Sequence, residues 1–278
     1  MIGLVALCGC AHYQPNPLDP AERAEEFESR RLDDEGLRAF LEKHLGHTIT
    51  NWPAQRWNLE TLTLAAYYFH PTLDVARAQW RVAEAAAISA GARPNPTINL
   101  APGYTANSPA GVTPWLMAAG FDWPIETAGK RNLRVTQAQH LVRVARLNLV
   151  TVAWQVRAKV RDSLAAYRFA GNQTGVLGEK VGLQRQIVAK LEARLKAGAI
   201  SQPELTPARI TLGKLEVELG AARENETVAA ARLAEAIGIS LRVLANAPKE
   251  MTLYTPMLSD EQLAVAKRRA LLNRYDLL

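Results

Sequence analysis

Residue types that build catalytic and metal sites are scarce in this chain. Its 278 residues include two cysteines and five histidines, and aromatic residues make up 6%. His44 and His47 lie three residues apart, but no cluster of further ligands lies near them in sequence, as a zinc site would require. The sequence has no nucleophile elbow, and Gly129–Arg131 lacks the first glycine and the trailing Ser or Thr of a phosphate loop. We therefore expect no enzyme, no metal and no cofactor.

Long hydrophobic runs and one-sided charge blocks are also missing. Beyond residue 10, no window offers about 18 consecutive apolar residues, which a membrane-spanning helix would need. The net charge is +6, but Lys and Arg are interleaved with Glu along the expected helices, and no basic block carries interleaved aromatics. We expect solvated helix surfaces and no nucleic-acid partner. The 48% of hydrophobic residues suffices for a packed core.

The amino terminus carries an apolar run from Ile2 to Gly9 that leads directly to Cys10. Segment 7–10 resembles a bacterial lipobox, in which small residues precede a cysteine that becomes acylated. Ala11 would then direct sorting to the outer membrane. A basic region before the run is missing, so either the true start lies upstream or the sequence is clipped. The alternatives are two buried cysteines or a disulfide, which would be strained between residues two apart.

The longest feature is a pair of helices around one turn, from about Glu126 to Ile239. No proline occurs between Thr127 and Ala197, and about 70 helical residues would span on the order of 100 Å. Spacings of three and four predict an apolar seam of the coiled-coil kind, so two antiparallel helices should pack together. An ordinary coiled-coil stalk is the alternative. The seam residues are Thr174, Leu177, Val181, Gln184, Val188, Leu191 and Leu195, then Leu205, Ala208, Leu212, Leu215, Leu219, Ala222, Glu226, Ala229, Leu233 and Ala236.

The turn between these helices, residues 197–203, has its own signals. Gly198 supplies the left-handed backbone that ends a helix. Ser201 is a natural N-cap, Pro203 falls in the first turn, and Glu204 lies three residues after Ser201, as in a capping box.

Shorter helices are expected on either side of the long pair. One runs from about Asp34 to Leu45, and a second runs from an N-cap at Asn58 to about Ala92 with a break at His70–Pro71. A last helix begins near Ser259. There, Leu263, Ala270 and Leu277 match Leu59, Ala66 and Leu73 at one constant offset, which suggests the start of a second repeat.

Between residues 97 and 123 the hydrophobic period changes to two. Tyr104 lies near the end of one alternating segment, and Trp115, Met117, Ala119, Phe121 and Trp123 alternate with small or polar residues in the next. This pattern is typical of two strands of a transmembrane β-barrel with aromatic residues at the lipid boundary. A hairpin packed on a soluble core is the alternative. Two strands cannot close a barrel, which needs about eight, so other chains or more chain would supply the rest.

Three segments together resemble the TolC-like outer-membrane efflux factor family, in particular its lipoprotein branch that partners resistance-nodulation-division pumps. They are Ala90–Pro96, Gly129–Arg131 with Arg134, and Ala193–Ser201. The resemblance implies a mainly α chain with a two-stranded β-hairpin and a long antiparallel coiled-coil hairpin. It would be one repeat of a trimeric α-barrel and outer-membrane β-barrel whose protomers carry two repeats. This sequence stops after one repeat.

The resemblance also implies roles and partners. Cys10 would carry the lipid anchor, and the lipid-facing strand residues would be Tyr104, Trp115, Met117, Phe121 and Trp123. The tip would dock a periplasmic adaptor (membrane fusion) protein that works with an inner-membrane pump. The expected location is the outer membrane of a Gram-negative bacterium, lipid-anchored and extending into the periplasm, as a homotrimer of the full-length protein. The docking residues would be Arg194, Gly198, Ile200, Ser201 and Leu205.

We therefore expect a passive export duct, the outer-membrane channel of a tripartite efflux or secretion system. The alternative is a periplasmic coiled-coil lipoprotein scaffold without a pore. The expected segments are a signal remnant (1–9), a tether with a short helix (10–57), a periplasmic helix (58–95), a β-barrel strand pair (96–124), the long helical hairpin of a tunnel (125–240), and a linker with the start of a second repeat (241–278).

Overall fold

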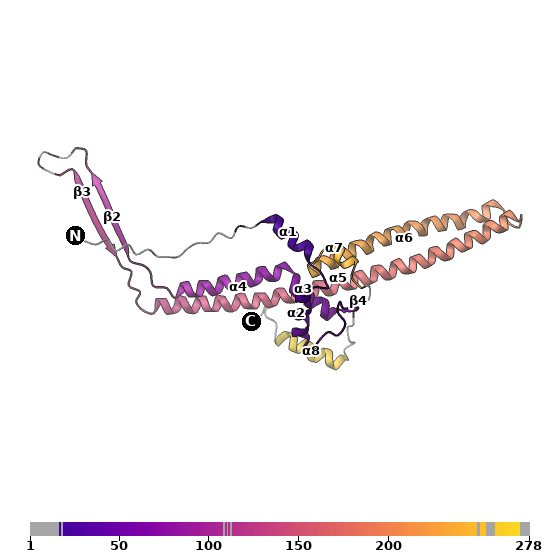
Figure 1. Ribbon diagram of the computed structural model, residues 1–278, viewed down its shortest axis with the longest axis horizontal. Coiled ribbons are helices and arrows are strands. Elements are labelled where there is room, and N and C mark those ends of the chain that lie inside the picture. The colour runs from indigo at the N-terminus through magenta and orange to yellow at the C-terminus, as the bar shows by residue number, and fades with distance from the viewer. Residues whose placement is uncertain are drawn as a thin grey trace. The chain divides into compact units, whose positions relative to one another are not determined.

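The computed structural model describes residues 17, 19–107, 109, 111, 113–248, 251–253 and 259–272 (Figure 1). The chain forms two compact units. The first unit combines Met1–Phe69 with Ser163–Leu253, and the second combines His70–Asp162 with Tyr254–Leu278.

The first unit is built from short helices around the base of a long helical pair. Its elements are α1 (Pro20–Ser29), α2 (Glu35–Leu45), β1 (Trp57–Asn58), α3 (Leu59–Phe69), the later part of α5 (Lys130–Lys196), α6 (Gln202–Ile237), α7 (Leu241–Ala245) and β4 (Met251–Thr252). Asp34 caps α2 by accepting a 2.7 Å hydrogen bond from the Leu37 amide, and Gly46 ends the helix at φ 74°. The fully buried side chains of this unit include Leu37, Leu41, Trp57, Leu62, Leu164, Leu233, Ile237 and Ile239.

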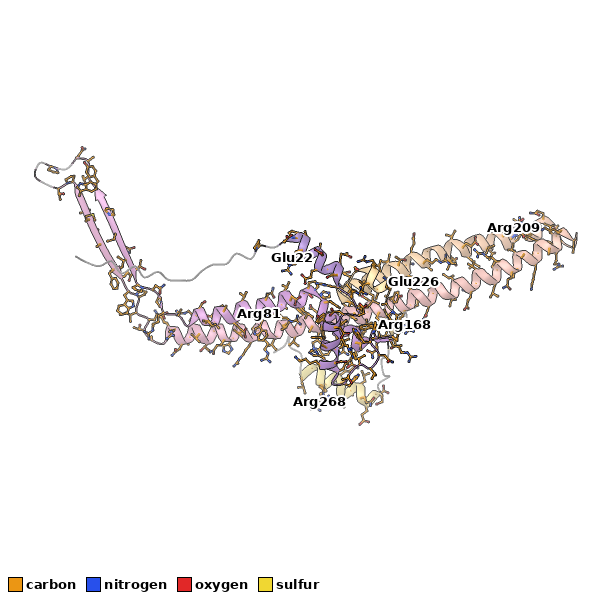
Figure 2. The ribbon with its side chains drawn as sticks, in the orientation of Figure 1. Glu22, Arg81, Arg168, Arg209, Glu226 and Arg268 are labelled. Carbon is orange, nitrogen blue, oxygen red and sulfur yellow. The ribbon has the colours of Figure 1, made fainter. Side chains whose placement is uncertain are left out.

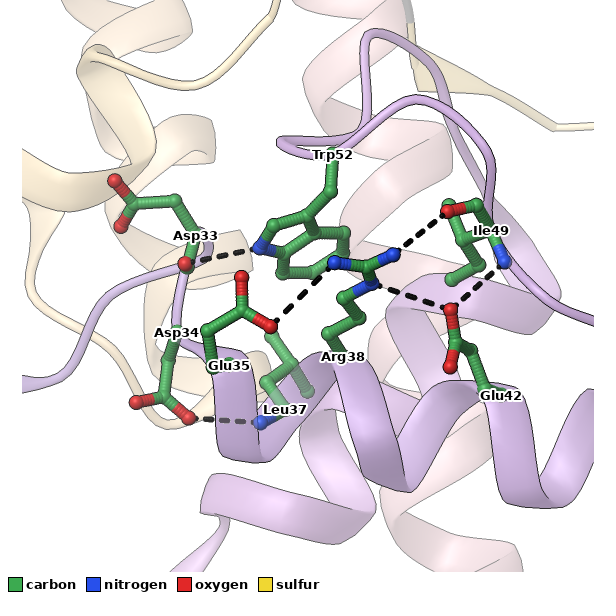
Figure 3. Close-up of polar contacts among 8 residues, drawn as sticks. All are labelled: Asp33, Asp34, Glu35, Leu37, Arg38, Glu42, Ile49 and Trp52. Carbon is green, nitrogen blue, oxygen red and sulfur yellow. Dashed lines mark hydrogen bonds and ion pairs between the residues drawn. The ribbon is translucent and has the colours of Figure 1, made fainter.

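A polar network fixes the loop after α2 (Figure 3). Glu42 accepts hydrogen bonds from the Ile49 amide at 2.9 Å and from Nε of Arg38 at 3.2 Å. These hydrogen bonds hold the pKa of the Glu42 carboxyl below its ordinary value, and the bond from the Ile49 amide has a larger effect than the bond from Arg38. Nε1 of Trp52 donates to the Asp33 carbonyl at 3.0 Å, which ties the far end of the loop to the start of α2.

One arginine joins two helix ends in this unit. Nη1 of Arg30 donates to the carbonyl of Phe69, which ends α3, at 2.9 Å, and to the carbonyl of Gly238, which follows α6, at 2.8 Å. Carbonyls at a helix C-terminus lack partners within the helix, and a cation there also complements the helix dipole. Arg30 therefore links α3 to α6 where both end.

The α5–α6 pair confirms the predicted antiparallel hairpin. Every predicted seam residue is buried or half-buried, while most positions between them are exposed. Nε2 of Gln184 donates to the Ala208 carbonyl at 3.0 Å, and ion pairs join Arg185 to Glu216 at 2.8 Å and Arg209 to Glu192 at 2.5 Å. Figure 2 labels Arg209 close to the turn between the two helices.

The second unit contains α4 (Pro71–Ala90), the strands β2 (Thr97–Tyr104) and β3 (Trp115–Asp122), the first part of α5, and α8 (Asp260–Leu272). The predicted break between α3 and α4 is confirmed at His70, whose ring accepts from the Thr72 amide as the N-cap. Apart from Arg77, the buried and half-buried positions of α4 follow spacings of three and four, as predicted up to Ala87: Leu73, Ala76, Trp80, Ala83, Ala87 and Ala90.

Several elements differ from the expectation. The helices α1 and α7 and the short parallel pair of β1 with β4 were not predicted. The long helix begins at Lys130 rather than near Thr127, because Ala128 and Gly129 adopt φ values of 55° and 71°, outside the helical region. The segment roles assigned from the sequence remain predictions.

Among the described helices, none combines the length and apolar character required to cross a bilayer.

The Arg30 link provides a stability test. Arg30→Ala should lower the free energy of unfolding by about 1–3 kcal/mol, because two carbonyls lose a charged donor. Arg23→Ala, which removes an ion pair with Glu26 that is exposed to solvent, should lower the free energy of unfolding much less than Arg30→Ala. Urea unfolding followed by circular dichroism compares the two variants, and equal midpoints would contradict the role of Arg30.

Candidate functional site

The strand pair brings the two predicted alternating faces together. The antiparallel register places Tyr104 opposite Trp115 and Ile98 opposite Phe121. Directly opposed residues point to the same side of a sheet. One side therefore carries Ile98, Leu100, Pro102, Tyr104, Trp115, Met117, Ala119 and Phe121, and the other carries Thr97, Asn99, Ala101, Gly103, Leu116, Ala118, Gly120 and Asp122.

No described residue covers the apolar side of this strand pair. Met117 is 73% exposed and Phe121 is 66% exposed, and seven of the eight residues of β2 and all eight of β3 are exposed. The alternative of a hairpin packed on the chain's own core is therefore wrong. An isolated two-stranded hairpin with an uncovered apolar side is not stable in water. Another molecule must therefore cover this side.

Aromatic side chains mark both ends of the pair. The rings of Tyr104 and Trp115 lie edge to face with centroids 5.0 Å apart at the end near the connecting loop. Trp123, which follows β3 at the other end, is exposed. Large amphipathic rings at two levels, separated by aliphatic residues, form the pattern found at membrane interfaces.

A cluster of polar contacts joins α4 to α5 beneath the strands. Nε of Arg131 donates to the Gly91 carbonyl at 2.7 Å, and Arg134 donates to the carbonyls of Ala90 at 2.8 Å and Ala92 at 3.2 Å. Arg134 also forms an ion pair with Glu126. The hydrogen bond from Arg134 holds the pKa of the Glu126 carboxyl below its ordinary value. The chain thus satisfies the carbonyls at the end of α4 where the strands leave it.

The turn between α5 and α6 is confirmed as a tight reversal. Gly198 has φ 69°, and its amide donates to the Leu195 carbonyl at 3.0 Å. The carboxylate of Glu204 accepts from the Ser201 amide at 3.2 Å and from the Ser201 hydroxyl at 2.7 Å. Both hydrogen bonds hold the pKa of the Glu204 carboxyl below its ordinary value, and the bond from the hydroxyl contributes most. An added Cβ at Gly198 would meet nothing within 4 Å, so the turn presents open backbone.

The five predicted docking residues are not equivalent in the structure. Arg194, Gly198 and Ser201 are exposed and Ile200 is half-buried, so these four can meet a partner. Leu205 is 0% exposed and packs within the seam. Its predicted place on the docking surface is corrected accordingly: Leu205 supports the turn from inside.

The structure gives less support to the other candidate positions. Cys10 and the lipobox segment lie outside the described residues. His44 and His47 direct Nδ1 to the carbonyls of Phe40 and Leu45, and the described part of the chain contains no group of three or more residues able to hold a metal ion.

Arg131 and Arg134 belong to one of the motifs shared with the family, but their contacts with the end of α4 were not predicted. The signal that could have revealed their role is their place in the first turns of a helix that follows a strand pair, since such arginines can reach the end of the preceding helix. The partner carbonyls are backbone atoms and leave no mark in the sequence.

Comparison with known proteins is consistent with this geometry. The family model described as outer membrane efflux protein matches residues 67–239. No curated protein matches the chain.

Solved structures show the same fold at low sequence identity. The outer membrane protein VceC from Vibrio cholerae is 20% identical, with a TM-score of 0.54 over 71% of this chain and 51% of that chain. The CmeC outer membrane channel of Campylobacter jejuni is 15% identical, with a TM-score of 0.59 over 73% and 45%. A membrane protein from Pseudomonas aeruginosa is 15% identical, with a TM-score of 0.61 over 78% and 53%.

The chain spans about half the length of these structures. Its fold is mainly α with a two-stranded β-hairpin and a long antiparallel helical hairpin, which is one repeat of the architecture they share. Because the family model covers more than half of the sequence, from the end of α3 to the end of α6, the chain belongs to the outer membrane efflux protein family.

Proposed function

We propose that this chain contributes to a passive export duct, the outer-membrane channel of a tripartite efflux or secretion system. The observation that carries the proposal is the exposed apolar side of β2–β3, a strand pair that follows α4 and leads into the long helix α5. A lipid bilayer can cover such a side, and closure with strands from other copies or from further chain would satisfy the strand edges.

The long helices also need neighbours. Outside the seam, α5 exposes Phe169, Val176 and Leu183 at intervals of seven residues, and α6 exposes Ile210 and Val217 at the same interval. A groove of about 670 Å³ that includes Phe169 and Val176 runs between the two helices. A helix with a second apolar stripe requires a second packing partner. We infer that copies of the full-length protein assemble into a ring, with a trimer as the expected form.

The turn at Gly198 suits docking. Its exposed residues are small or flexible, and its open backbone leaves room for the end of another helix. We infer that this tip meets the helical hairpin of a periplasmic adaptor, and that an inner-membrane pump supplies the energy. Of the similar solved structures, VceC is an outer membrane protein and CmeC is an outer membrane channel, which favours a duct over a catalyst.

A scaffold lipoprotein without a pore is the competing proposal. It accounts for the helical hairpin, but it gives no reason for an apolar strand surface that no described residue covers. The strand pair therefore favours the duct, and variants of that surface test the choice.

A charge on the apolar side of the strands should prevent membrane insertion. Met117→Arg should cost about 2–4 kcal/mol if this position faces the middle of the bilayer. The matched control is Ala118→Arg, one residue further along β3 and on the opposite side. Outer-membrane fractions resistant to urea extraction are measured for both variants. We expect only Met117→Arg to lose membrane insertion. If both variants insert equally well, the side that carries Met117 does not face lipid.

Bulk at the turn should impair adaptor binding. Gly198→Trp places a large side chain at φ 69° on the proposed docking surface, and we expect at least about tenfold weaker capture of the cognate adaptor. Gly213→Trp on exposed α6 is the control, since an added Cβ there also meets nothing within 4 Å. Helical content should be unchanged in both. Full adaptor capture by Gly198→Trp would exclude docking at the turn.

The proposed lipid anchor is tested by metabolic labelling with palmitate. Cys10→Ser should abolish labelling because the thiol that carries the lipid is gone, whereas Cys8→Ser should retain it. Labelling that persists in Cys10→Ser would show that the anchor, if present, lies elsewhere.

A further inference from the structure

The first half of α5 is strongly basic. Between Glu126 and Asp162 the chain has eight Lys and Arg residues and no Asp or Glu. The expectation that cations alternate with Glu along the helices is therefore wrong for this half of α5, although it holds for α6, which has six Glu against four Lys and Arg. The eight residues are Lys130, Arg131, Arg134, Arg143, Arg146, Arg157, Lys159 and Arg161.

Three of these arginines lie on one flank of the helix. Arg146 and Arg157 follow Arg143 by 3 and 14 residues, which is close to one and four whole turns. All three side chains are exposed. At 1.5 Å per residue they extend along about 21 Å of the helix. We name Arg143, Arg146 and Arg157 the arginine stripe.

The adjoining helix α4 contributes to the same side of the second unit. A groove of about 580 Å³ is lined by Glu84 and Ile88 of α4 and by Gln139 and Arg143 of α5. Arg81 precedes Glu84 by three residues, so it lies on the same flank of α4 and is also exposed (Figure 2). Arg81 therefore lies on the groove side with the arginine stripe.

Few acids neutralise this surface. Within the described residues, Arg81, Arg143 and Arg146 form no ion pair. The guanidinium of Arg157 lies 5.3 Å from the ring centroid of the exposed Trp154, which orients it without neutralising it. The nearby acids are Asp74, which pairs with Arg77 at 2.8 Å, Glu84 in the groove, and Asp162, which pairs with Arg161 at 2.8 Å.

We propose that the arginine stripe, with Arg81, binds polyphosphate, an extended chain of linked phosphate groups. Unpaired guanidinium groups in a row prefer a chain of anionic groups, because each group can accept charge-assisted hydrogen bonds and release counterions. The separation of Arg146 from Arg157 is about 16 Å along the axis, so a short anion cannot reach both. This binding is independent of the duct.

The test measures binding of fluorescent long-chain polyphosphate to the complete purified chain in detergent. The variant with Arg143→Gln, Arg146→Gln and Arg157→Gln should bind at least about tenfold more weakly at low salt, and its salt dependence should fall by roughly two to three units of slope. Glutamine is a good helix former, so circular dichroism should be unchanged. The corresponding Arg→Lys variant should retain most of the binding because it keeps the charges.

The matched control removes the same net charge elsewhere. Lys180, Lys190 and Lys214 are exposed on the α5–α6 pair, and their replacement by Gln should leave the affinity within about threefold. Equal loss in both triple variants would reduce the effect to net charge and overturn the proposal. So would unchanged binding in the arginine variant, or tripolyphosphate binding as tightly as the polymer, which would indicate a small-anion site.

Discussion

The main constraint on this structure is that one copy of the chain leaves a large apolar surface exposed to solvent. Burying a Val, Leu, Ile, Phe or Met side chain is worth about 1.5–3 kcal/mol, and both the strand pair and the long helices leave such side chains exposed. For β2–β3 the exposed set forms a continuous side, whereas on α5 and α6 it forms stripes beside a seam that is already filled. In the proposed duct, lipid would cover the strand surface and further helices would cover the helix stripes.

Long helices carry their unsatisfied backbone groups to their ends, so the ends determine where the chain can turn. At the end of α4, Arg131 and Arg134 supply donors from the next helix. At the turn before α6, Glu204 accepts a hydrogen bond from the Ser201 amide, and Gly198 adopts the left-handed conformation that ends α5. In both places side chains or a left-handed residue satisfy backbone groups at the helix ends, so the strand surface and the exposed turn can meet other molecules.

The sequence predicts best where one physical pattern repeats. Each predicted seam position from Thr174 to Ala236 avoids full exposure, and the strand bounds follow from alternation, because burial on one face imposes a strict period. The period carries no information about α1, all of whose residues are exposed, or about the pairing of Trp57 with Met251 across almost two hundred residues. Leu205 shows a subtler limit: its place beside the turn suggested an accessible residue, while the seam period already required a buried one.

The first half of α5 lacks the acids that α6 carries, and this difference argues that its basic half has a purpose beyond solubility. A solvated helix needs only mixed charge, as α6 has, and neighbouring cations with no acid between them in the helix repel one another. Arg143, Arg146 and Arg157 are all exposed, so burial against α4 does not select arginine at these positions. Repulsion among neighbouring cations is relieved when an anionic chain lies along them. The cost of keeping these arginines unpaired in the isolated protein is therefore best explained by a ligand that pairs with them.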